Sequence, residues 1–179
     1  MANYSYLYSS HDSGPPDPDE EPIATGRYFI PVFWIASCTL EDIYTDVDED
    51  DEEVPYISLP ASKALSQFEV NRNSLEAISP DVQKYYDEWT GLLHQLGDAQ
   101  LKIDPSEVIF MTEEDDSSFR EAVKFFSEAN ESRVNGLLRN SCLTDILDAN
   151  NPNKLLEYAI VNDEITELTT SDYLIGIRE

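Results

Sequence analysis

The chain has few of the residues on which catalytic, metal and nucleotide sites are usually built. Its 179 residues include two cysteines, two histidines and six glycines. Cys38 and Cys142 are too few for a disulfide framework, and both lie among apolar neighbours, so we expect buried, reduced thiols. Six glycines leave little material for loops that cradle phosphate, and no nucleotide-binding or zinc-protease motif is present.

Basic residues and long apolar runs are also scarce. The 11 lysines and arginines are scattered and provide no footprint for phosphate, so we expect no direct nucleic-acid binding. No apolar run approaches the roughly 18 residues of a membrane-spanning helix. The opening MANYSYLYSS lacks the basic and apolar regions of a secretory signal. We therefore expect no membrane association and a cytoplasmic location.

The two histidines offer no catalytic arrangement. His11 lies in a proline-rich stretch and His94 beside the apolar stripe of a predicted helix, and neither accompanies a recognisable serine or cysteine motif. Carboxylate pairs identify no site, because acidic residues occur in every segment. We expect a non-enzymatic protein without a cofactor.

Negative charge is what the chain has in excess. Its 37 acidic residues give a net charge of −26. They gather in two clusters, a first of Asp46, Asp48, Glu49, Asp50, Asp51, Glu52 and Glu53, and a second of Glu113, Glu114, Asp115 and Asp116. Because self-repulsion makes a compact state less stable, the excess indicates solubility, a strongly basic partner, or both.

A calcium site is one interpretation of the first cluster. Asp46, Asp48 and Asp50 match the start of an EF-hand loop. However, Asp51 stands where the sharp turn needs glycine, and Ile57 stands where a bidentate glutamate is needed. We expect weak, non-selective cation binding there and no dedicated metal site.

A partner-binding surface is the interpretation that the flanking residues favour, although a merely solvated face remains an alternative. Tyr44 and Tyr56 bracket the first cluster, and aromatic side chains beside charge are typical of interface anchors. The candidate partner-binding residues are therefore these two tyrosines together with both acidic clusters.

Apolar content predicts a real core, with hydrophobic residues at 41% and aromatic residues at 11%. We expect residues 1–179 to form a single globular domain with a mobile acidic loop at 45–55. The predicted fold is α+β, helix-dominated, with a few short strands.

Local patterns predict the individual elements. Period-2 alternation or short apolar runs predict strands over Tyr4–Tyr8, Glu107–Met111 and Tyr173–Ile177, with Arg27–Phe29 extended and residues 11–22 a loop. Helices are expected from Val32 to Leu40 (with a buried strand as the alternative), Ala61–Arg72, Ser79–Gly97, from Ser118 to about Leu138, and over 144–149 and 154–161. Trp89 falls on the apolar face of the Ser79–Gly97 helix.

The N-terminal region resembles a group of uncharacterised bacterial proteins that begin Met-Ala-Asn-x-Ser-Tyr-Leu-Tyr and continue with Tyr-x-Ile-Pro. The matching segments here are Met1–Tyr8 and Tyr28–Pro31. Proteins of that kind are similar to immunity proteins of bacterial toxin–antidote systems. The resemblance covers about the first 40 residues and transfers no binding residue.

Two functions fit a small, acidic chain with few motifs. The first is an antidote that binds and blocks a basic, cytoplasm-acting toxin, with a nuclease as the expected toxin. The alternative is a nucleic-acid mimic, whose carboxylates imitate phosphates and occupy a DNA- or RNA-binding protein. An antidote needs one patch with aromatic anchors, whereas a mimic needs acids spread over an extended face.

Overall fold

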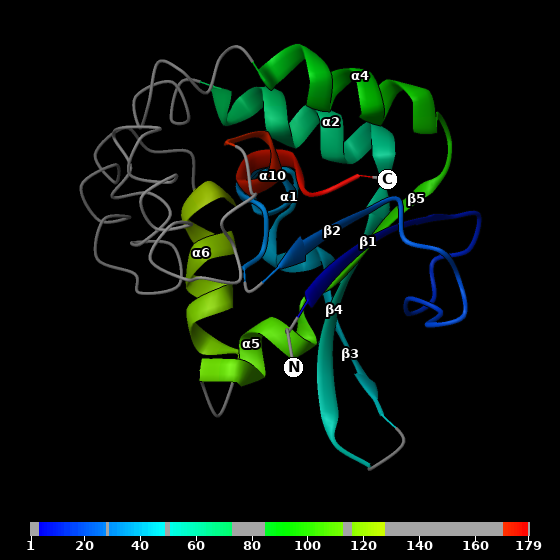
Figure 1. The fold of residues 1–179 in the computed structure, drawn as a ribbon, viewed down its shortest axis with the longest axis vertical. Helices are drawn as coiled ribbons and strands as arrows, with labels where there is room; N and C mark the ends of the chain where they lie inside the picture. The colour runs from blue at the N-terminus through cyan, green and yellow to red at the C-terminus, as the bar shows by residue number, and fades with distance from the viewer. Residues whose placement is uncertain are drawn as a thin grey trace.

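The centre of the molecule is an antiparallel sheet of five strands in the order β2-β1-β5-β4-β3 (Figure 1). The computed structural model describes residues 4–27, 29–48, 51–72, 85–112, 116–127 and 170–178. The strands are β1 Tyr4–Ser10, β2 Ala24–Arg27, β3 Ile43–Val47, β4 Glu53–Pro60 and β5 Gln100–Asp104. Every neighbouring pair is antiparallel.

Helices gather against one face and one end of this sheet. They are α1 Val32–Ala36, the 3₁₀ helix η1 Leu40–Asp42, α2 Ala61–Val70, α4 Tyr86–Leu96, α5 Ser106–Thr112, α6 Ser117–Ser127 and α10 Thr170–Ile175. In Figure 1, α2 and α4 lie side by side at one end, and α1 packs against α6 and α10. In the described part of the chain, no helix is long and apolar enough to cross a bilayer.

The expectation of a helix-dominated fold is wrong, because the five-stranded sheet organises the core. The overall class is α+β, but β3, β4 and β5 were not predicted. In β5, polar and apolar residues alternate over Gln100–Asp104, and the central Lys102 is buried despite its charge. β4 contains Pro55, which has no backbone N–H to donate. It lies where β4 pairs with β3 alone, because pairing with β5 starts at Ile57.

Two predicted strands are helices. Residues 107–111 lie in α5, which begins where the Asp104 carboxylate accepts hydrogen bonds from the Ser106 backbone N–H (3.0 Å) and hydroxyl (2.6 Å). The C-terminal prediction also fails over most of its length, because Thr170–Ile175 is α10. Only Ile177 pairs as expected for a strand, in a single bridge to Thr25. Short apolar runs do not distinguish the two structures by period alone.

Other local predictions are confirmed. β1 forms over the alternating tyrosines and α2 follows Pro60. Along α4, Tyr86, Trp89 and Leu93 are buried at helical spacing, and the helix stops at Gly97, whose φ is +59°. The predicted start at Ser79, like the predicted helices at 144–149 and 154–161, lies outside the described residues.

The apolar run after Pro31 gives a shorter helix than predicted. α1 ends at Ala36, where the buried Ser37 hydroxyl donates to the carbonyl of Phe33 at 2.6 Å. That hydroxyl also accepts a hydrogen bond from the Trp89 indole at 2.9 Å, which joins α1 to α4. Cys38 is buried as expected, whereas Cys142 lies outside the described residues.

The outer edge of β2 is closed by the C-terminal segment. Thr25 and Ile177 exchange two backbone hydrogen bonds, of 2.9 and 2.7 Å. Gly176, with φ of +97°, lets the chain turn against the ring of Trp34. The fully buried Trp34 indole donates to the carbonyl of Ile175 at 2.7 Å. The C-terminal turn is therefore held by both the core and the sheet.

Candidate partner-binding site

The first acidic cluster lies on the β3–β4 hairpin, which projects from the sheet at the end opposite α2 and α4 (Figure 1). β3 and β4 pair from Ile43–Ile57 out to Val47–Glu53, but β5 accompanies β4 only from Ile57 onward. The outer half is thus a two-stranded ribbon. The mobile loop expected at 45–55 is replaced at both ends by paired strand.

The tip of the hairpin is a turn built by the acidic residues themselves. The Asp48 N–H donates to the Glu52 carbonyl at 3.0 Å, and the Asp48 carboxylate accepts from the Glu52 N–H at 2.9 Å. Asp51 takes the left-handed backbone conformation that such turns need, with φ of +62°. Asp48 therefore helps to shape the turn as well as carrying charge.

Four carboxylates of the hairpin make no ion pair within the described residues: Asp46, Asp51, Glu52 and Glu53. All four residues are exposed. Lys63, by contrast, is paired with Asp42 at 2.5 Å. Glu49 and Asp50, which belong to the same predicted set, lie outside the described residues. The described part of the run therefore presents negative charge that the rest of the described chain does not neutralise.

Tyr44 and Tyr56, the two tyrosines that bracket the first acidic cluster, lie directly opposite each other across β3 and β4. Their rings stack with centroids 5.6 Å apart and planes 27° apart. Tyr44 is 46% exposed. The pKa of Tyr56 is raised by partial burial and by the nearby Asp46 carboxylate. The pair forms an aromatic platform beside the acidic ribbon.

The second acidic cluster is mostly beyond what the structure describes. Glu113, Glu114 and Asp115 lie outside the described residues. Asp116 lies before α6 and forms an ion pair with Arg120 Nε at 2.7 Å. The negative charge of Asp116 is therefore partly neutralised by a residue in the first turn of α6. Ser118, the predicted cap of this helix, lies just after its start at Ser117.

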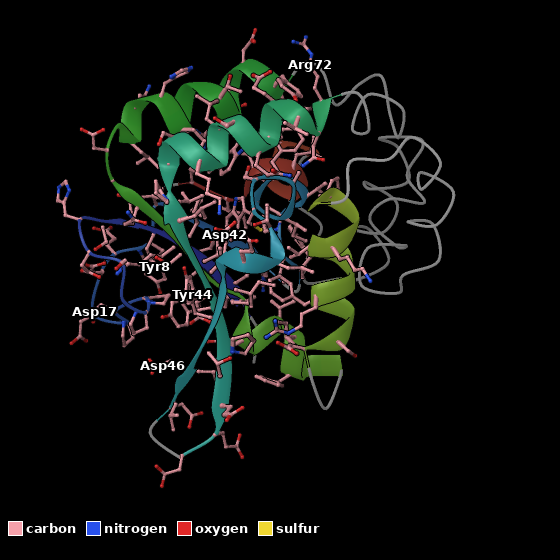
Figure 2. The ribbon with its side chains drawn as sticks, turned by 180° about the vertical axis from the view of Figure 1, so that it is seen from behind. Tyr8, Asp17, Asp42, Tyr44, Asp46 and Arg72 are labelled. Carbon is pink, nitrogen blue, oxygen red and sulfur yellow. The ribbon has the colours of Figure 1, made fainter. Side chains whose placement is uncertain are left out.

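Sequence reasoning missed three further tyrosines on the same face of the sheet. Tyr4, Tyr6 and Tyr8 alternate along β1, and the register places Tyr6 opposite Asp104 of β5. Asp104 and Tyr56 each lie one residue beyond the Ile57–Ile103 pair, so they share this face. We call the five residues Tyr4, Tyr6, Tyr8, Tyr44 and Tyr56 the tyrosine face. Figure 2 shows Tyr8, Tyr44 and Asp46 on the side of the sheet away from α6.

Carboxylates make the tyrosine face electronegative. Glu107 of α5 accepts hydrogen bonds from the Tyr4 backbone N–H at 3.0 Å and the Tyr6 hydroxyl at 3.3 Å. Partial burial and the carboxylates of Glu107 and Asp104 raise the pKa of Tyr6 to about 12. The pKa of Tyr8 is also raised to about 12, first by burial and then by the same acids. Such surroundings disfavour a further negative charge and favour a cation.

One cation already occupies the middle of this face. Lys102 lies opposite Tyr8 and is 1% exposed. Its ammonium donates to the Asp12 carboxylate at 2.6 Å and to the Pro15 carbonyl at 3.1 Å. The bond to Lys102 is the main cause that lowers the pKa of Asp12 to about 2. The Lys102 contacts fasten the proline-rich segment 11–22 over the inner part of the sheet.

The described side chains of the candidate site are carboxylates and tyrosines. No group of three or more His, Cys, Asp or Glu side chains in the described ranges is arranged to hold a metal ion. Burial raises the pKa of the Cys38 thiol, so it is a poor nucleophile. What the arrangement offers is a projecting acidic ribbon with stacked tyrosines at its base.

Comparison of the chain with protein-family models, with curated proteins and with solved structures produced no match.

Proposed function

We propose that this chain is a non-enzymatic antidote that binds and neutralises a basic toxin, of the nuclease type, inside the cytoplasm of the bacterium that makes both. The observation that supports it best is the projecting β3–β4 hairpin, on which Asp46, Asp51, Glu52 and Glu53 make no ion pair with any residue that the structure describes. A nuclease binds phosphate with basic side chains, so such a hairpin complements its substrate groove.

The charge and the aromatic pair have different tasks in this proposal. Exposed carboxylates attract a basic partner over long range and speed encounter. The stacked Tyr44 and Tyr56 supply apolar and cation–π contact once the partner has arrived. The same pair favours an antidote over the nucleic-acid mimic, because imitation of phosphates does not need an aromatic anchor.

We expect a nuclease-type toxin domain to be encoded beside this chain in its native genome, and the test is co-expression of the chain with such a domain. Wild-type chain should restore growth to bacteria that express the toxin domain. A hairpin variant with Asp46→Asn, Asp51→Asn, Glu52→Gln and Glu53→Gln should associate with the purified toxin tenfold or more slowly at low salt. Raising the salt should narrow that difference, since the Debye length falls from about 30 Å at 0.01 M to about 10 Å at 0.1 M.

A control variant separates the hairpin from overall charge. Glu21→Gln, Glu69→Gln, Asp87→Asn and Asp98→Asn removes the same number of charges from exposed positions outside the hairpin. Its association rate should fall much less than that of the hairpin variant. Equal slowing of both variants would show that the hairpin has no special part. Failure of the wild-type chain to restore growth would overturn the antidote function.

A further inference from the structure

The two edges of the sheet differ in what covers them. β2 is bridged on its outer side by Ile177, whereas within the described residues β3 pairs with β4 alone. An edge strand with unpaired backbone groups is a template for another strand. The hairpin therefore offers hydrogen-bonding groups as well as charge.

Three observations show which residues of β3 direct their backbone hydrogen-bonding groups toward β4 and which direct them outward. Asp48 donates to the Glu52 carbonyl, so Asp48–Glu52 is a hydrogen-bonded pair. Pairs alternate along an antiparallel ladder, which makes Thr45–Pro55 a non-hydrogen-bonded pair. Pro55 has no N–H to give, in agreement with this phase. Ile43, in the same phase, donates its N–H to Leu40 of η1 rather than to β4.

It follows that Thr45 and Val47 direct their backbone N–H and C=O groups away from β4. Neither residue has another backbone hydrogen bond among the described residues. We propose that this edge binds an extended basic segment of the toxin as an added antiparallel strand. This docking mode rests on the proposed antidote function and specifies how the hairpin performs it.

The side chains beside the edge define what the added strand must contain. Tyr44 and Asp46 lie on one face of β3, and Ile43, Thr45 and Val47 alternate on the other. Lysine or arginine on the first face would lie beside the Tyr44 ring and the carboxylates. Apolar residues on the second face would cover Val47, which is 54% exposed. The matching segment therefore alternates basic and apolar residues.

A second copy of this chain does not fit the edge. Pairing two β3 strands would bring Asp46 and the acidic tips of both hairpins together, with a net charge of −26 on each chain. Like charges on adjacent strands destabilise the pair. Acidic side chains on an exposed edge are a common way to prevent self-association. The same charges attract a basic strand.

A capped peptide, Lys-Val-Lys-Val-Lys-Val-Lys, is the probe for this docking mode. It should bind the full chain at low salt and slow the hydrogen exchange of the Thr45 and Val47 amides, measured by NMR. The amides of Tyr44 and Asp46, already bonded to β4, should change little. A peptide of the same composition, Lys-Lys-Val-Val-Val-Lys-Lys, should bind more weakly and protect neither amide. Equal binding and equal protection by both peptides would overturn strand pairing.

Methylated peptides and a proline variant test the backbone bonds directly. Methylating the valine nitrogens, which face β3 in antiparallel pairing, should weaken binding at least tenfold, whereas methylating the lysine nitrogens should not. On the protein side, Thr45→Pro removes one outward N–H and should weaken binding roughly fivefold or more, as expected for one lost hydrogen bond. Thr45→Val keeps the N–H and should bind like wild type. Unchanged binding with methylated valines overturns the proposal whether or not Thr45→Pro folds.

The toxin assay keeps the two proposals apart. Full growth rescue and unchanged toxin affinity for a folded Thr45→Pro variant would overturn strand pairing while the antidote function stands. Conversely, the peptide readout does not use toxicity, so it can support edge pairing even if the wild-type chain fails to restore growth.

Discussion

The two edges of the sheet are protected from unwanted pairing in different ways. At β2 the chain uses its own C-terminal segment, which bridges Thr25 through Ile177 and is locked to the core by Trp34. At β3 the protection is charge, carried by a ribbon that extends beyond β5. A covered edge is closed to every strand, whereas a charged edge is closed only to strands of the same sign.

The difference indicates where the molecule is built for stability and where it is built for recognition. Closing the β2 edge buries backbone groups and an indole in the core. At the β3 edge, exposed tyrosine, valine and carboxylate side chains surround backbone groups that have no hydrogen-bond partner among the described residues. Changes at the first edge should therefore act on the free energy of unfolding, and changes at the second should act on binding.

The largest effect is expected from breaking the β2 edge at Trp34. Trp34→Ala empties a fully buried site and removes the donor to the Ile175 carbonyl, so it should lower the free energy of unfolding by about 3–5 kcal/mol. Urea denaturation measures this loss, and the Thr25 and Ile177 amides should exchange faster. A loss below about 1 kcal/mol would mean that the C-terminal turn does not depend on the core.

A smaller effect is expected at Gly176. Its φ of +97° is strained for any side chain, and an added Cβ would lie 2.7 Å from the Trp34 ring. Gly176→Ala should destabilise on the order of 1–3 kcal/mol. Gly91→Ala is the matched control, because a Cβ there meets nothing within 4 Å. In the interior of α4 it should stabilise by about 0.5–1 kcal/mol. Similar thermal shifts for both variants would contradict this account of Gly176.

The smallest effect on stability is expected at the tip of the acidic edge. Asp51 has φ of +62°, a conformation that glycine adopts without steric cost. Asp51→Gly should stabilise the hairpin by less than about 1 kcal/mol. Asp51→Asn removes the same charge but keeps a side chain at the positive φ. Comparing the two variants therefore separates the effect of backbone strain from the effect of charge repulsion. Slower amide exchange in β3 and β4 for the glycine variant, relative to the asparagine variant, is the expected result. Equal exchange rates would show that the turn is unstrained.

Patterns within a few residues predicted several elements correctly. The alternating tyrosines predicted β1. The helical spacing of Trp89 and Leu93, with Gly97 at the end, predicted α4. These signals are local, because one element's period and cap suffice to produce them. Where a short apolar run lacked a distinct period, as at residues 107–111, the hydrogen bonds from Ser106 to the Asp104 carboxylate mark the start of a helix.

The central strands, which were not predicted, depend on residues that lie far away in the chain. Lys102 is buried in β5 through the carboxylate of Asp12, 90 positions earlier in the chain. Pro55 fits β4 because the register does not require a backbone N–H donor at that position. Neither condition is visible in the few residues around it. Because these strands were not predicted, the fold was expected to be helix-dominated.

For the candidate site, the sequence alone determined the charge, the poverty of catalytic and basic residues, and the proximity of Tyr44 and Tyr56 to the first acidic cluster. Tertiary structure decided that these residues form a projecting hairpin and that Tyr4, Tyr6 and Tyr8 share its face. It also decided that the C-terminal segment bridges one edge, whereas the other edge pairs with β4 alone in the described part of the chain. Composition and local period are properties of the chain itself. Strand order and register depend on pairings between distant segments, which no local pattern specifies.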